Sequence, residues 1–294
     1  MFLKKIEKKA LAFSGIFCLC TGLFSGDVLA AGLADRAAAA MLAPHRAIYE
    51  IRLVSAQSGS QLVNVSGRMM YEWRPTCDAW ISKHRFDIAY EYADTPPMTI
   101  SSDFSTFEPF DGKSMDFTSQ RRKDGVLYEE LRGRAEHEAK TGTASYTMPP
   151  DLDFDLPEGT LFPVGHTLAV LEAQQAGTKF FKSVIFDGSD DQGPVEVTSF
   201  LGASVDDKDK YKGNKDIDAN LMTGEAWKAR LAFFPLDEMS ETSDYEMSLV
   251  FHENGIITDM VINYDDFTIS QDLVALEPVE SDCTPDAPQG KEKP

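Results

Sequence analysis

Short turn dipeptides separate a series of strand-like segments. These turns limit the possible folds more than any other feature of the sequence. The dipeptides at residues 111–112, 124–125 and 254–255 are Asp-Gly, Asp-Gly and Asn-Gly. Asn, Asp and Gly tolerate the positive φ angles of a type I′ turn, so each dipeptide predicts a tight hairpin between antiparallel strands. From His45 onward we therefore expect a mainly β protein.

The turn at residues 254–255 predicts the register of its own hairpin. The residues that a two-residue loop places opposite each other are Tyr245 and Tyr264, Met247 and Ile262, and Leu249 and Met260. These pairs form an apolar face, whereas the alternate residues form a mixed one. Such a contrast is expected of an antiparallel sheet that covers a core on one side.

The same reasoning gives a different result at residues 124–125. A two-residue loop there places Phe117 opposite Arg132 and Ser119 opposite Glu130, so neither face is cleanly apolar. We expect these two strands to form an exposed ribbon or an edge of the sheet.

One helix is expected among the strands. Pro163 suits the first turn of a helix and Gly177 suits its end, which gives a helix of about 13 residues. The apolar residues that share one face at helical spacing are Leu161, Val164, Leu168 and Leu171. This stripe predicts packing against the sheet.

Residues 1–30 have the features of a secretory signal peptide. Four lysines precede an apolar run that is shorter than a membrane-spanning helix needs. Val28 and Ala30 are modest or small side chains at the two positions that guide cleavage. We expect a signal peptide cut near Ala30 and export to the periplasm; the alternative, a single membrane anchor, needs a longer apolar run.

Two cysteines remain after that cleavage, Cys77 and Cys283. A lone pair in an exported chain favours a disulfide, because the compartment is oxidising. The alternative is two separate buried thiols. A bridge would tie the end of the chain to an early strand, and it therefore favours one domain over two.

The expected organisation of the chain follows. A single domain spans residues 44–283, after an Ala-rich segment at 31–43 and before a disordered, Pro- and charge-rich tail at 284–294. Within the domain, residues 203–224 are rich in Asp and Lys, which predicts a solvated loop.

Charge and motifs argue against several classes of function. The net charge of −20 disfavours binding to nucleic acid. The 5 histidines have no further His or Cys at metal-ligand spacing, and the chain has no nucleophile-elbow, dinucleotide-binding or P-loop motif. We expect no enzymatic activity, no bound metal and no cofactor.

Several segments together resemble a known family. Residues 42–49, 66–72, 156–163, 186–190 and 245–267 are similar, in order and spacing, to the alphaproteobacterial cell-envelope integrity protein B family, long catalogued as a domain of unknown function. The resemblance implies a periplasmic protein with a long antiparallel sheet wound into a spiral, β-barrel-like shape, here with one packed helix. It also implies a disulfide between an early and a late cysteine, and it supplies no catalytic residues.

We expect a non-enzymatic factor that maintains the cell envelope by binding an envelope protein partner. The alternative, a second function, is a carrier or sensor that holds a lipid or other apolar ligand in the concave sheet. The candidate ligand-facing residues for this second function are Tyr245, Met247, Leu249, Met260 and Ile262, although side chains of this kind are more often plain core.

Overall fold

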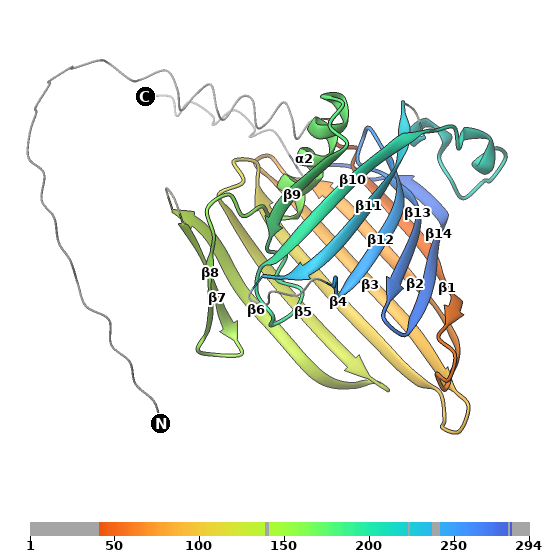
Figure 1. Ribbon diagram of the computed structural model, residues 1–294. Coiled ribbons are helices and arrows are strands. Elements are labelled where there is room, and N and C mark those ends of the chain that lie inside the picture. Colours follow the sequence, from red (N-terminus) through yellow and green to blue (C-terminus); the bar gives the residue numbers. More distant parts are fainter. Residues whose placement is uncertain (1–40, 139–140, 223, 237–241, 282, 284–294) are drawn as a thin grey trace, which may run out of the picture.

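The fourteen strands of the described residues join in one antiparallel sheet (Figure 1), which confirms the expected mainly β class. The computed structural model describes residues 41–138, 141–222, 224–236, 242–281 and 283. The predicted signal peptide, most of the Ala-rich segment and the predicted tail lie outside the described residues.

The first eight strands are β1 (His45–Ala56), β2 (Leu62–Pro75), β3 (Ala79–Tyr92), β4 (Met98–Pro109), β5 (Ser114–Lys123), β6 (Val126–Glu138), β7 (Thr141–Met148) and β8 (Leu152–Leu156). The helix α2 (Pro163–Gln175) follows them. The remaining strands are β9 (Phe180–Ile185), β10 (Val195–Val205), β11 (Ala226–Pro235), β12 (Tyr245–His252), β13 (Ile257–Tyr264) and β14 (Phe267–Pro278), and two 3-10 turns lie at Lys208–Tyr211 and Ala219–Leu221.

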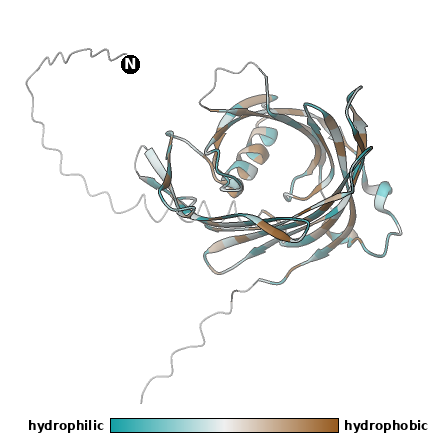
Figure 2. Ribbon diagram, turned by 90° about the horizontal axis from the view of Figure 1, so that it is seen from below, coloured by the Kyte–Doolittle hydropathy of each residue, from teal (hydrophilic) through white to brown (hydrophobic). Residues whose placement is uncertain are grey.

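One long-range pairing joins the two halves of the sheet, and β8 and β9 remain as its edges. The strand order is β8-β7-β6-β5-β4-β3-β2-β1-β14-β13-β12-β11-β10-β9, so β1 and β14 pair although they stand at opposite ends of the sequence. Seen along its axis, the sheet curls around an interior that contains α2 (Figure 2). Within the described residues no helix is long and apolar enough to cross a membrane.

Helix α2 has the predicted bounds but a different buried face. It runs from Pro163 to Gln175, and Gly177 follows with a φ of 71°. Its buried residues are His166, Val170 and Leu171, whereas Val164 and Leu168 of the predicted stripe are only partly buried. A helix inside a curved sheet meets side chains from more than one direction, so a single apolar stripe does not describe its environment.

The hairpin of β12 and β13 has the predicted register. Met247 lies opposite Ile262 and Leu249 opposite Met260. A register shift after Val250 makes the connection longer than the expected two residues. The apolar face points into the interior of the curved sheet, as the alternation of side chains requires.

The hairpin of β5 and β6 differs from the prediction. Asp124 and Gly125 form the expected turn with φ angles of 50° and 80°, but a bulge between Arg121 and Arg122 then moves the register by one residue. Phe117 therefore lies opposite Gly133 instead of Arg132. A one-residue slip exchanges the two faces of a strand, so these strands have a clean apolar face and lie within the sheet rather than at its edge.

The acidic segment at residues 203–224 was expected to be solvated, and this prediction is wrong. Tyr211, Ile217 and Met222 of this segment are buried in the main hydrophobic cluster. The Asp207 carboxylate accepts a hydrogen bond from the Thr258 hydroxyl at 3.0 Å and lies 3.2 Å from Nε2 of His252. Composition did not reveal the apolar residues that attach the segment to the sheet, nor the buried position of Asp207.

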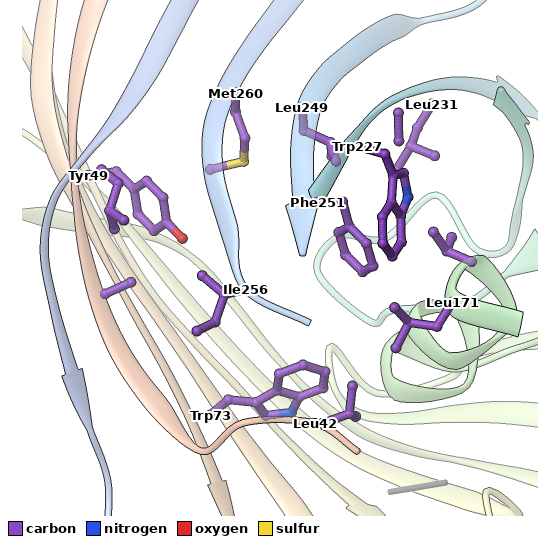
Figure 3. Close-up of a cluster of buried hydrophobic side chains, with 14 of the residues drawn as sticks. Leu42, Tyr49, Trp73, Leu171, Trp227, Leu231, Leu249, Phe251, Ile256 and Met260 are labelled. Atoms are coloured by element: carbon purple, nitrogen blue, oxygen red, sulfur yellow. The ribbon is translucent and has the colours of Figure 1, made fainter. Parts of the chain in front are cut away.

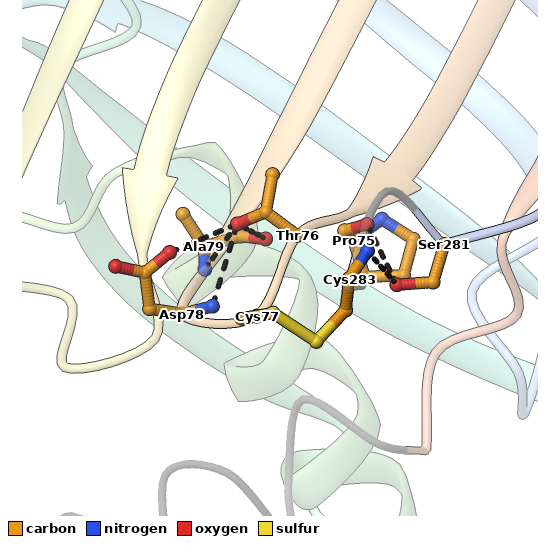
Figure 4. The surroundings of a disulfide bond; sticks show 7 residues. All are labelled: Pro75, Thr76, Cys77, Asp78, Ala79, Ser281 and Cys283. Carbon is orange, nitrogen blue, oxygen red and sulfur yellow. Dashed lines mark hydrogen bonds between the residues drawn. A yellow bond between two sulfur atoms is a disulfide. The ribbon is translucent and has the colours of Figure 1, made fainter. Parts of the chain in front are cut away.

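Cys77 and Cys283 form a disulfide (Figure 4), with Cα atoms 4.6 Å apart and a separation of 206 positions in sequence. Cys77 lies between β2 and β3, and Cys283 follows β14. The Ser281 hydroxyl donates to the carbonyl oxygen of Pro75 at 3.1 Å and accepts from the backbone N–H of Cys283 at the same distance. The bridge thus fixes the end of the chain beside the second hairpin.

Residues 186–194 fill the interior next to the two edge strands. The hydroxyl of Tyr146 donates to the carbonyl oxygen of Asp190 at 2.7 Å, and the Arg121 guanidinium donates to that of Ser189 at 2.9 Å. Gly188 lies so close to Phe117 that a Cβ atom there would be 2.4 Å from the ring. This segment packs on the inner faces of β5 and β7, and its Phe186 belongs to a second hydrophobic cluster that is distinct from the main one.

Candidate ligand-binding site

A cavity of about 320 Å³ lies between α2 and the inner face of the sheet. Side chains from both halves of the sheet line it, because the β1–β14 pairing brings the first and last strands together. Its apolar lining includes Tyr49, Trp73, Phe104, Met247, Phe251 and Met260. Several of these residues belong to the main hydrophobic cluster (Figure 3).

The period-two alternation of the long strands places large rings on the cavity wall. Met69, Tyr71 and Trp73 of β2 all face inward, and Tyr71 contacts His84 of β3 with ring centroids 4.7 Å apart. Tyr71 also lies 5.5 Å from His45 of β1. The wall is therefore a continuous aromatic surface that spans three adjacent strands.

The structure places the five candidate ligand-facing residues in two groups. Met247, Met260 and Ile262 line the cavity. Leu249 shares their face but packs within the main cluster (Figure 3), where 6% of it is exposed. Tyr245 stacks on Phe233 with ring centroids 4.3 Å apart and does not line the cavity.

Glu108 is the principal polar group of the cavity, and only 2% of it is exposed. Its Oε2 accepts a hydrogen bond at 3.0 Å from the backbone N–H of Val164 in the first turn of α2. The Thr106 hydroxyl lies 3.4 Å from the other carboxyl oxygen and 2.6 Å from the Ser82 hydroxyl. Glu108 thus connects the sheet to the start of the helix, which has no side-chain cap of its own.

Burial raises the pKa of Glu108 to about 8, against the smaller opposite effects of its hydrogen bonds to Val164 and Thr106. Asp187, which also lines the cavity, adds to this rise because its negative charge opposes ionisation. The Glu108 carboxyl is consequently uncharged at neutral pH.

Three histidines add further uncharged polar groups to the lining. Burial lowers the pKa values of His84 and His166 to about 4, so both rings are neutral at neutral pH. Burial also lowers the pKa of His45, whose Nδ1 lies 2.7 Å from the carbonyl oxygen of Ala43. Across the described residues, no three His, Cys, Asp or Glu side chains are grouped in a way that could hold a metal ion.

Sequence reasoning missed the polar side of this cavity. No motif contains Glu108, and its partner Val164 is 56 residues away. The sequence did contain one signal. Every second residue of a strand points to the same face of the sheet, so Glu108 lies on the same face as Phe104 and Thr106. This alternation indicates that the Glu108 carboxyl points inward, but it does not indicate that the carboxyl binds the first turn of α2.

The arrangement can bind a molecule with an apolar body. Large apolar side chains form most of the cavity wall, and the polar groups of the described lining residues include no Lys and no Arg. Small-molecule sites commonly combine an apolar lining with a few fixed polar groups that orient the ligand.

Comparison with known proteins gives consistent results. The family profile described as EipB-like matches residues 36–280. The cell envelope integrity protein EipB of Brucella abortus (strain 2308) is 30% identical over 253 residues, which are 84% of this chain and 88% of that protein. A crystal structure of a β-barrel-like protein of domain of unknown function DUF1849 from Brucella abortus is similar with a TM-score of 0.74 and 29% identity, over 81% of this chain and 99% of that one.

Proposed function

Because the chain belongs to the EipB-like family, we propose that it helps to maintain the integrity of a bacterial cell envelope by binding an apolar ligand inside its curved sheet. The resemblance found in the sequence is confirmed at the level of the family. The binding role rests on the cavity and on the relative's description as a cell envelope integrity protein.

The observation that carries the proposal is the combination of volume and lining. A volume of about 320 Å³ is near the lower end of the range of about 300–1,000 Å³ typical of small-molecule sites. The methionines among the lining residues, Met69, Met247 and Met260, can adapt to ligands of different shape. Of the two binding functions left open by the sequence, the cavity supports the ligand carrier or sensor more directly than the protein-binding factor.

We place the protein in the periplasm. The expected signal peptide with cleavage near Ala30 supports export, and a Cys77–Cys283 disulfide suits an oxidising compartment. The role is proposed to be non-catalytic, because the polar groups of the cavity bind and orient rather than form a nucleophile with its base.

Native mass spectrometry of the protein purified from its own periplasm tests this function. A retained apolar molecule, released under denaturing conditions and identified by its mass, is the expected result. A bare protein that instead captures a defined envelope protein would replace the ligand carrier by the protein-binding factor.

Two tryptophan variants of β12 provide a matched test of the site. Met247→Trp should fill the cavity and abolish ligand retention, because Met247 lines it. Leu249→Trp changes the same face two residues away but overpacks the core, so it should cost about 1–3 kcal/mol of stability and keep the ligand. Equal retention by both variants would contradict a ligand site in this cavity.

A further inference from the structure

We propose that the cavity selects a single-chain amphiphile with an uncharged, hydrogen-bonding head, and that it places this head at Glu108. The inference rests on the proposed ligand-binding function and narrows its ligand class. It distinguishes an alcohol, ester or amide head from a carboxylate or phosphate head.

The charge distribution around the cavity carries the first step. Among the described residues that line it there is no Lys and no Arg. Arg121 also points to the interior, but its guanidinium is 2.7 Å from the Glu129 carboxylate and does not line the cavity. An anionic head would therefore be desolvated without a counter-ion, beside the carboxyl groups of Glu108 and Asp187.

The hydrogen bonding of Glu108 carries the second step. Oε2 already accepts from the Val164 N–H, which leaves the other oxygen to hold the proton of the uncharged acid. That oxygen has only a long contact of 3.4 Å with the Thr106 hydroxyl. An uncharged carboxyl in this position can donate its O–H to an acceptor oxygen of a ligand in the cavity.

The size of the cavity supports a single-chain ligand. A volume of about 320 Å³ at the lower end of the range for ligand sites fits one alkyl or acyl chain rather than a two-chain lipid. The aromatic and methionine lining suits such a chain along its whole length. The raised pKa of Glu108 and the lowered pKa values of His84 and His166 agree with an uncharged site.

Competition between matched ten-carbon probes tests the inference. Decanol, decanoate and decylamine, each below its solubility limit or critical micelle concentration, are titrated against bound N-phenyl-1-naphthylamine, an uncharged fluorescent probe, at about pH 6. We expect decanol to displace the probe at a concentration lower than that of decanoate by at least about tenfold, because decanoate brings a negative charge into a site whose described lining residues include no Lys or Arg.

Binding of the same probes to Glu108 variants tests whether the head group of the ligand lies at Glu108. Glu108→Leu should weaken decanol binding about tenfold while N-phenyl-1-naphthylamine still binds, since one hydrogen bond is lost but the apolar wall remains. Glu108→Gln should recover most of the loss, because its amide also donates. Glu172→Gln, an exposed glutamate of the same helix, is the control that leaves all three probes unaffected.

The pH dependence provides a readout that a purely structural role of Glu108 would not give. Methyl nonanoate, a ten-carbon ester whose head only accepts hydrogen bonds, gives this readout: raising the pH from about 6 to about 9.5 should weaken its binding to the wild type but not to Glu108→Gln, because an ionised carboxyl cannot donate. The titratable groups that also face the cavity are Asp187, His45, His84, His166, Tyr49 and Tyr71. Burial lowers the pKa values of the three histidines and raises those of the two tyrosines, so it moves both kinds of group away from this pH range.

The outcomes separate the inference from the function on which it rests. If decanoate or decylamine binds as well as decanol, or Glu108→Leu leaves decanol binding unchanged, the inference is wrong and the ligand site survives. If neither N-phenyl-1-naphthylamine nor any ten-carbon probe binds, the proposed ligand-binding function fails as well.

Discussion

Replacing Glu108 by Gln, which keeps a buried hydrogen-bonding group but removes its titratable proton, should make the protein more resistant to alkaline conditions. In the wild type, burial raises the pKa of Glu108 to about 8 from an ordinary value of 4.5. Between these values the folded protein holds a proton that the unfolded chain has released. The free energy of unfolding therefore falls as the pH rises from the lower value to the higher one.

The size of this fall follows from the two pKa values. A difference of about 3.5 pKa units corresponds to about 5 kcal/mol, of which about 4 kcal/mol lies between pH 5 and pH 9. Gln keeps the shape of the uncharged acid but does not titrate. The stability of Glu108→Gln relative to the wild type should therefore increase by about 4 kcal/mol over this interval.

Urea denaturation of both proteins at about pH 5 and about pH 9 measures this difference. Other titratable groups are common to both proteins, so their effects cancel in the comparison. The control Glu172→Gln removes an exposed carboxyl from the same helix and should differ from the wild type by no more than about 0.5 kcal/mol at either pH. A Glu108→Gln difference that changes by less than about 1 kcal/mol between the two pH values would refute the argument for a buried, uncharged carboxyl.

Two further predictions concern the packing of the interior and the disulfide. Gly188→Ala should cost about 3 kcal/mol or more in urea denaturation, because its Cβ would lie 2.4 Å from the Phe117 ring at a φ of 69°; Gly59→Ala, with φ 92° and no atom within 4 Å, should cost only about 1 kcal/mol, and equal losses would contradict the close packing. Cys77→Ser should lower Tm while far-UV circular dichroism keeps the sheet signal, since losing closure of a 206-residue loop costs up to about 5 kcal/mol; an unchanged Tm under non-reducing conditions would count against the bridge to Cys283.

The β12–β13 hairpin shows how much of the fold a local pattern can predict. Tyr245, Met247 and Leu249 alternate with polar or smaller residues, and the Asn-Gly turn restricts their partners, so both the inward face and the register followed from the sequence. The β5–β6 hairpin has an equally clear turn, yet a bulge after two residue pairs changed its register. Such a bulge is favoured by the packing of Phe117 and Leu131 in the interior, which a local pattern does not contain.

The sequence by itself determined the strand-rich class, the bounds of α2, the inward face of the β12–β13 hairpin and the two cysteines available for a bridge. These properties depend on turn chemistry, helix ends and period-two alternation, all of which act over a few residues. Only the tertiary structure decided that β1 pairs with β14, that residues 203–224 attach to the sheet, and that Glu108 meets Val164. Each of these contacts joins segments that are distant in sequence, and its stability comes from burial that exists only after the sheet has curled around the helix.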